Sequence, residues 1–148
     1  MITLKDIFKA VCSHFTETTD LPVVDSDIEE PVLRPSFKIF MNTVNTGHYS
    51  SALRQVKVYF NIYFYSSDRK ESKAEMMDIE DKIAFSFLEP LEIKETCCVY
   101  IDELEFEKVT EGVLKCSFNF EIATEFIDES GLEAMEEIKI KENVINNN

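Results

Sequence analysis

The sequence VKVYFNIYFY, residues 56–65, alternates strictly between two kinds of side chain. One set of alternate positions is apolar and comprises Val56, Val58, Phe60, Ile62 and Phe64. The other set comprises Lys57, Tyr59, Asn61, Tyr63 and Tyr65. Because successive side chains of a strand point to opposite faces, this pattern predicts a β-strand with one fully apolar face. The tyrosines allow two interpretations: a neighbouring subunit covers their face, or they form an exposed aromatic ladder that stabilises the sheet.

Further segments show β-strand patterns. Ser36–Met41 and Leu114–Ile122 alternate in the same way as the central segment, and each predicts a strand. A polar stretch after Met41 predicts a long loop, Asn42–Leu53, that is mobile in the free subunit. Cys98–Lys108 is rich in β-forming residues, but its apolar phase shifts, and a bulge near Asp102–Glu103 would explain the shift.

Two segments have helical periodicity. Thr3–Phe15 has one apolar stripe, formed by Leu4, Ile7, Phe8, Val11 and Phe15. Thr3 can cap this helix, and the polar segment Thr16–Asp20 is expected to end it. A proline-containing connector follows, in which Val23–Val24 can form a short strand.

The second helix is predicted to begin at the capping-box sequence Ser72-Lys73-Ala74-Glu75. Its buried stripe is formed by Met76, Ile79, Ile83 and Phe87. Pro90 limits its extent.

The order of these segments predicts an α+β fold, an antiparallel sheet with both helices packed on its apolar face. We expect a single domain over residues 1–127, followed by an acidic C-terminal tail over residues 128–148 whose apolar spacing is weak. Truncation after Ile127 is therefore expected to leave the domain folded.

Charge and composition exclude several classes of protein. The chain has 148 residues and a formal net charge of −14, which opposes binding to nucleic-acid phosphates. Residues 1–88 carry 10 basic and 13 acidic side chains, whereas residues 89–148 carry 5 basic and 16 acidic. No apolar run approaches the length of a membrane span. Because the amphipathic N-terminus carries Asp6, it is not expected to be a signal peptide, and the protein is expected to be intracellular when made.

The sequence contains no recognisable catalytic or metal-binding motif. His14 is expected near the end of the first helix, where it can favour the terminal carbonyls, and His48 lies in the polar stretch. Cys97 and Cys98 are adjacent and would point to opposite faces of a strand, which disfavours a metal site shared with Cys116. We therefore expect no enzymatic activity, no metal and no cofactor.

Several segments, taken in order, resemble the tail terminator family of phages and phage-like particles of Firmicutes. The resemblance runs from about Ile2 to Ile122 and includes the opening ITLKDIFKA, RPSFKI at 34–39, VYFNIYF at 58–64, EMMDIEDKI at 75–83 and EGVLKCSFNF at 111–120. Each segment alone is weak evidence for the family, because the apolar pattern of an ordinary strand or helix would produce it. Their order and spacing together are more specific.

This resemblance implies a small subunit that assembles into a ring, typically sixfold. Such a ring docks on the last ring of the tail tube and stops further polymerisation, and in contractile tails it also contacts the sheath protein. In a phage it then presents the surface for the head connector, and in a headless contractile bacteriocin it acts as the cap. The resemblance places the protein in the tail of a virion or phage-like particle, assembled in the bacterial host cytoplasm.

A ring built from one repeated interface needs two unlike patches on each subunit. The candidate subunit or tube contacts are Tyr59, Tyr63, Tyr65, Asn45, Gly47, His48 and Tyr49. Two alternatives remain open, a head–tail connector or other minor tail protein, and an acidic monomeric binding or inhibitor module. Gene neighbours distinguish the first of these, and a size measurement distinguishes the second.

Overall fold

The central strand of the sheet is β3, Leu53–Tyr65, which contains the alternating segment. In the computed structural model, residues 2–24, 33–48 and 53–125 are described. The sheet has five strands in the order β1-β2-β3-β7-β6. Their bounds are β1, Val23–Val24; β2, Ser36–His48; β6, Glu105–Thr110; and β7, Val113–Glu125. All neighbouring pairs are antiparallel except β1 and β2, which are parallel.

The register of the three long strands brings their apolar sets to one face. Phe60 lies between Met41 of β2 and Phe118 of β7. Ile62 and Phe64 have equally apolar partners on both sides, and all five apolar positions of the β3 segment are buried. The alternation in the sequence therefore identifies the core face correctly.

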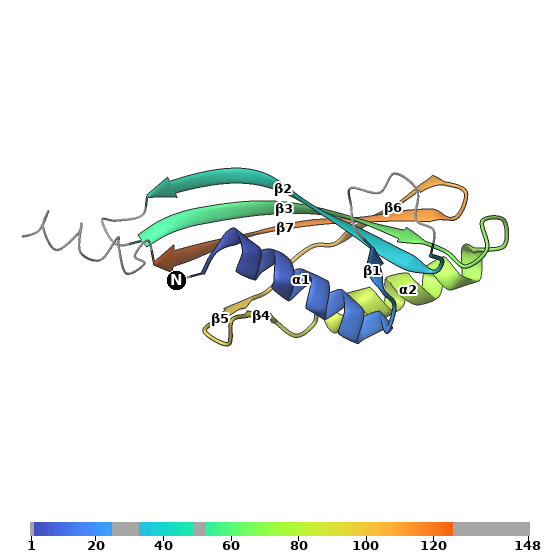
Figure 1. The fold of residues 1–148 in the computed structure, drawn as a ribbon, viewed down its shortest axis with the longest axis horizontal. Coiled ribbons are helices and arrows are strands. Elements are labelled where there is room, and N and C mark those ends of the chain that lie inside the picture. Colours follow the sequence, from blue (N-terminus) through green and yellow to red (C-terminus); the bar gives the residue numbers. More distant parts are fainter. Residues whose placement is uncertain (1, 25–32, 49–52, 126–148) are drawn as a thin grey trace, which may run out of the picture.

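Both helices lie on this apolar face (Figure 1). They are α1, Leu4–Thr19, and α2, Lys73–Ser86. A small hairpin of β4, Leu91–Ile93, and β5, Cys97–Val99, lies on the same side of the sheet. The predicted α+β fold is confirmed, with two helices and a mostly antiparallel sheet.

Aromatic rings join the helices to the sheet. Phe15 of α1 lies with its ring centroid 5.6 Å from that of Phe37 and 6.4 Å from that of Phe118. Phe87, which follows α2, lies 5.8 Å from Phe15 and 5.4 Å from Phe118. These ring contacts hold α1 and the end of α2 against the sheet.

The first helix differs from its prediction at one end. Its beginning is as expected, because Thr3 Oγ1 accepts a hydrogen bond from the Asp6 N–H and the Asp6 carboxylate accepts one from the Thr3 N–H. The helix continues four residues past Phe15 to Thr19. The hydroxyl groups of Thr16 and Thr19 donate to carbonyls four residues earlier, so these polar side chains are hydrogen-bonded within the helix.

The capping box predicted at Ser72 is wrong. Ser72 makes no side-chain cap hydrogen bond, and its backbone is already close to helical. Glu75 instead accepts hydrogen bonds from the N–H and hydroxyl of Ser67, at 3.0–3.1 Å. The Glu75 carboxylate is therefore engaged in a tertiary contact and not in the cap that the local pattern predicted. The buried stripe of this helix is confirmed, since Met76, Ile79, Ile83 and Phe87 are all buried.

Two further predictions are wrong in their boundaries. The expected loop after Met41 is largely strand, because β2 continues to His48 and pairs with β3 through a register shift between Thr43 and Asn45. Backbone hydrogen bonds hold this part, and they require no apolar side chains. Residues 49–52 of the predicted loop lie outside the described residues. The segment from Cys98 to Lys108 is not one bulged strand, because its two halves join different sheets, β5 with β4 and β6 with β7.

Candidate functional site

The outer face of the sheet carries the predicted tyrosines. Tyr59 is 40% exposed, whereas Tyr63 and Tyr65 are half-buried. The ring of Tyr63 meets that of Phe40 on β2 edge to face, with centroids 5.6 Å apart and planes at 88°. Such a geometry is favourable for aromatic pairs. The aromatic surface therefore extends from β3 across to β2.

Cationic side chains lie among these rings. The Lys57 ammonium is 5.4 Å from the Tyr59 ring centroid, and the Arg34 guanidinium is 5.5 Å from that of Tyr65. Lys115 on β7 is paired in register with Tyr63. Burial raises the pKa of Tyr65, Tyr63 acts in the same direction, and Arg34 opposes them. The same register pairs Lys57 with Glu121 and Lys115 with Glu107, so this face combines aromatic groups with charges of both signs.

A hollow of about 320 Å³ lies beside Tyr59. Its outer-face lining is polar and comes from Asn61, Ser117 and Asn119 of the two central strands, together with Glu103 and Glu105. The Ser117 hydroxyl donates to the Asn61 side-chain oxygen at 2.9 Å. The outer face therefore has a recess as well as an aromatic surface.

The other predicted contact residues lie at the far end of β2. Asn45 is paired with Lys57 and Gly47 with Gln55, and both Asn45 and Gly47 are exposed. They therefore continue the outer face beyond Tyr59, in a strand and not in the loop that was expected. His48 ends β2 through its backbone pairing with β3. Tyr49 lies outside the described residues.

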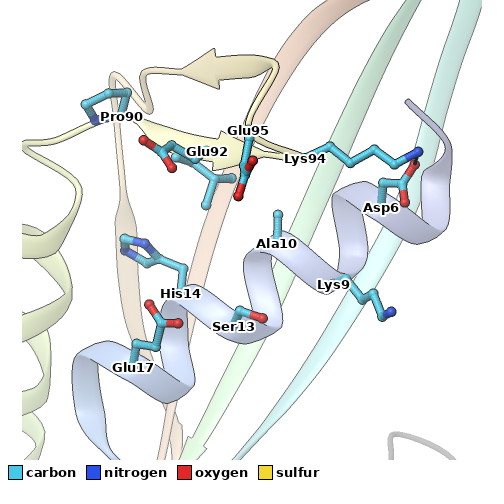
Figure 2. A pocket seen from close by; sticks show the side chains of 11 residues that line it. Asp6, Lys9, Ala10, Ser13, His14, Glu17, Pro90, Glu92, Lys94 and Glu95 are labelled. Atoms are coloured by element: carbon cyan, nitrogen blue, oxygen red, sulfur yellow. Dashed lines mark ion pairs between the residues drawn. The ribbon is translucent and has the colours of Figure 1, made fainter. Parts of the chain in front are cut away.

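A second hollow, of about 700 Å³, separates α1 from the β4–β5 hairpin (Figure 2). Its walls are charged on both sides: Asp6, Lys9 and Glu17 come from α1, and Glu92, Lys94 and Glu95 from the hairpin. At one end of this hollow, the Lys94 ammonium forms an ion pair of 3.2 Å with the Asp6 carboxylate. The backbone hydrogen bond from Thr3 is the main reason that the pKa of Asp6 is lowered, and Lys94 adds to this effect.

His14 lies on the wall of this second hollow but has a structural environment. Its ring stacks on Phe87 with centroids 4.3 Å apart, and its Nε2 lies 2.8 Å from Ser86 Oγ. Burial lowers the pKa of His14, and the nearby Glu17 carboxylate partly opposes this. The predicted role at the helix end is wrong, because α1 continues to Thr19 and the ring faces α2.

The His14–Ser86 pair is not an activated nucleophile. The Ser86 hydroxyl donates its proton to the Ile83 carbonyl at 2.6 Å. Its oxygen is therefore placed to accept an N–H from His14, whereas a general base would have to accept the serine proton. The contact joins α1 to the end of α2.

The thiols and carboxylates of the described residues show no metal-binding arrangement. Within residues 2–24, 33–48 and 53–125, no group of three or more His, Cys, Asp or Glu is placed to hold a metal ion. Burial, with a smaller effect of Glu80, raises the pKa of Cys116 to about 12, so its thiol stays protonated at neutral pH. Among the helices that the structure describes, none is long and apolar enough to span a membrane.

Sequence reasoning found the outer face but missed the second hollow. That hollow exists because the β4–β5 hairpin lies beside α1, and each strand of the hairpin has only three residues. Three residues are too few for an alternation pattern to be recognised. The positive-φ residues Lys94 and Glu95 form the turn, but neither is a typical turn residue.

Comparison with protein families identifies a match over most of the chain. A family model described as "Phage tail terminator protein" matches residues 6–131, which is most of the chain. A search of curated proteins found no significant match.

Proposed function

We propose, because this chain belongs to the phage tail terminator family, that it forms a sixfold ring that caps the end of a tail tube and stops its polymerisation. Membership of the family gives the chain a structural role in tail assembly. The ring, its stoichiometry and the cap are our proposal. In a contractile tail the ring would also contact the sheath protein, and in a phage it would contact the head connector.

The observation that carries this proposal is the outer face of the sheet. A sheet with only one covered face usually presents a polar, charged surface to water on the other. Here β3 places Tyr59, Tyr63 and Tyr65 on the second face, and Phe40 extends the aromatic surface onto β2. Aromatic residues are enriched in the buried centres of protein interfaces. We propose that this face is covered by another subunit in the assembled tail.

The net charge affects how readily rings form. Fourteen excess negative charges on each copy repel one another over roughly a Debye length, about 8–10 Å at physiological salt. We therefore expect rings to be favoured by salt and by docking onto an unfinished tube. Negative charge facing the lumen would keep DNA from adhering during passage.

The experiment compares the wild type with Tyr63→Glu by sedimentation, negative-stain imaging and measurement of tube length. The wild type should form closed rings, alone at high concentration or on tubes, and should limit tube length. Tyr63→Glu should stay monomeric, because the substitution puts an unpaired charge into a buried interface. Tyr100→Glu is the matched control, since Tyr100 is 65% exposed and lies outside the sheet.

Two results would count against the proposal at different levels. If the wild type stays monomeric and leaves tube length unchanged when tubes are present, the ring and cap are wrong. If Tyr63→Glu forms rings as well as the control, the ring stands and the outer face is not its interface. Circular dichroism of each variant establishes that the monomer is folded.

A further inference from the structure

Strand β2 is paired along only a short part of its outer edge. Its neighbour on that side, β1, pairs with Phe37 and Lys38 alone. Within residues 2–24, 33–48 and 53–125, no strand lies beside Ile39–His48, which is about 33 Å of edge at about 3.3 Å per residue. The exposed residues of this open edge include Asn42, Asn45, Thr46 and Gly47.

The other side of the sheet has an open edge at the same end. Strand β6 pairs with β7 only over residues 113–117, so among the described strands none lies beside Phe118–Glu125. Met41 of β2 and Phe118 of β7 are both paired with Phe60, and from that level to the end of the sheet both outer edges are open. Figure 1 shows β2 and β7 running in the same direction on the two sides of β3. The molecule therefore has two open strand edges that are level with each other.

The open edge of β2 lacks the usual protection of an edge strand. Natural proteins commonly place charged side chains or proline on such an edge, which keeps other strands away. The sequence of Ile39–His48, IFMNTVNTGH, contains no Lys, Arg, Asp, Glu or Pro, in a chain with 30% charged residues. By contrast, the outermost strand on the other side, β6, carries Glu105, Glu107 and Lys108 among its 6 residues. The edge of β2 therefore has the composition of a strand that pairs with another strand.

We propose that the open edge of β2 pairs with the open edge of β7 in the next copy of the ring, so that neighbouring copies share one continuous sheet. This inference rests on the proposed ring and specifies the junction between its copies. The backbone N–H and C=O groups of the two edges supply the hydrogen bonds, as in complexes formed by strand addition. The strand added beside β2 also lies next to Phe40, whose ring contacts Tyr63, so it covers part of the outer face.

The strand directions fit a closed ring. Strands β2 and β7 are both antiparallel to β3, so they are parallel to each other. A rotation about an axis close to the strand direction keeps that direction, and it brings β7 of one copy beside β2 of the next as a parallel pair. Because the two open edges are level, the next copy is reached with little displacement along the axis. A ring that closes requires this, whereas a helical filament does not.

Twofold pairing of identical edges is the alternative, and it does not form a ring. Two β7 edges would bring the exposed Glu121 toward its own copy, and like charges juxtaposed at an interface are costly. Two β2 edges would meet without charge repulsion, but they would leave both β7 edges open and stop at a dimer. Pairing β2 with β7 instead places Glu121 beside a segment that has no acidic side chain.

The register identifies an N–H group that would bond across this junction. The Phe37 N–H points to the outer side of β2, because it donates to the Pro22 carbonyl at 3.0 Å. In an antiparallel pair of strands, the N–H groups of opposite residues point toward each other and away from each other at alternate pairs. Phe37 is paired with Phe64. Thr46 is paired with Val56, which lies an even number of residues from Phe64 along β3, so the Thr46 N–H also points to the open side.

The first test is Thr46→Pro, which removes this N–H at an exposed edge position, where a strand tolerates proline. The variant should remain a folded monomer by circular dichroism and thermal melting. It should form no rings at concentrations at which the wild type forms them, with or without tubes. Thr46→Val is the matched control, because it keeps the N–H, and it should form rings. If Thr46→Pro forms rings like the wild type, the ring stands and the edge of β2 is not its junction.

The second test does not depend on the folding of the proline variant. Benzoyl-phenylalanine replaces the exposed Asn45 in the full chain, and rings are assembled from an equal mixture of nitrogen-15-labelled and unlabelled copies. Mass spectrometry of the cross-linked peptides separates contacts between copies from contacts within one copy. We expect cross-links between copies to residues 118–125.

Three results of the cross-linking would overturn the proposal: cross-links from position 45 to β2 of another copy, to residues 126–148 of either copy, or to the tube protein in place of β7. Each of these results leaves the ring in place and assigns the open edge to a different occupant. If the wild type forms no rings, with or without tubes, the proposed function itself has failed, and the junction fails with it.

Discussion

Replacing Phe15 by alanine removes the ring that joins α1 to both the sheet and the end of α2. Phe15 is fully buried and lies 5.6–6.4 Å from the rings of Phe37, Phe87 and Phe118. Truncation of a buried phenylalanine costs about 3–5 kcal/mol of unfolding free energy. Aromatic pairs contribute about 0.5–1.5 kcal/mol beyond their buried area. We therefore expect a loss in the upper part of that range, about 4–5 kcal/mol.

The assay is urea denaturation at a protein concentration at which sedimentation shows only monomer, so that assembly does not add to stability. A domain of this size has about 5–15 kcal/mol of stability, and Phe15→Ala should lower the midpoint strongly with little change in slope. Phe85→Ala is the matched control, a phenylalanine on a helix that is 71% exposed. We expect it to change the unfolding free energy by no more than about 0.5 kcal/mol. Equal effects of the two substitutions, or a loss below about 1.5 kcal/mol for Phe15→Ala, would refute the argument that this cluster anchors the helices.

Gly112 has φ +73°, and a Cβ there would lie 2.8 Å from Arg69 Cα, so Gly112→Ala should lower the unfolding free energy by about 1–3 kcal/mol. Gly47→Ala is the control and should be nearly neutral in the monomer, because no atom lies within 4 Å of a Cβ at that position. Thermal melts measure both changes. Because burial lowers the pKa of His14 below its ordinary 6.5, the folded state favours the neutral ring, and the stability it contributes is present above pH 6.5 and is lost as pH falls. The wild type should therefore lose more stability than His14→Asn between about pH 7.5 and pH 5.5, and parallel pH profiles would show that the ring does not titrate as argued. A chain ending at Ile127 should keep a cooperative thermal transition, because the described core is complete before that residue; loss of the transition would place the tail within the fold.

The strands could be predicted where one face is buried along their whole length. The period of two in β3 and β7 is visible because every second residue enters the same core. The second half of β2 could not be predicted, since Asn42–His48 is held by backbone pairing with β3 and a register shift disrupts its alternation. The Ser72 capping box was predicted from local spacing and does not form, because Ser67 lies close enough in space to engage Glu75.

The candidate site was likewise predicted only in part from the sequence. The sequence showed an aromatic second face on β3, and it also contained Met77, Phe85 and Leu88, which are exposed in the structure. The helical pattern identified the buried stripe of α2 correctly, but it did not show how exposed the other apolar residues are.

The amino-acid sequence by itself determined the core face of the sheet, the two helices, the acidic character and the family resemblance, because each depends on periodicity, net charge or ordered local segments. Only the tertiary structure decided how far the strands extend, that the β4–β5 hairpin borders a hollow beside α1, and that both helices cover the same face of the sheet. These properties depend on distances between residues far apart in the chain. No local pattern records such distances.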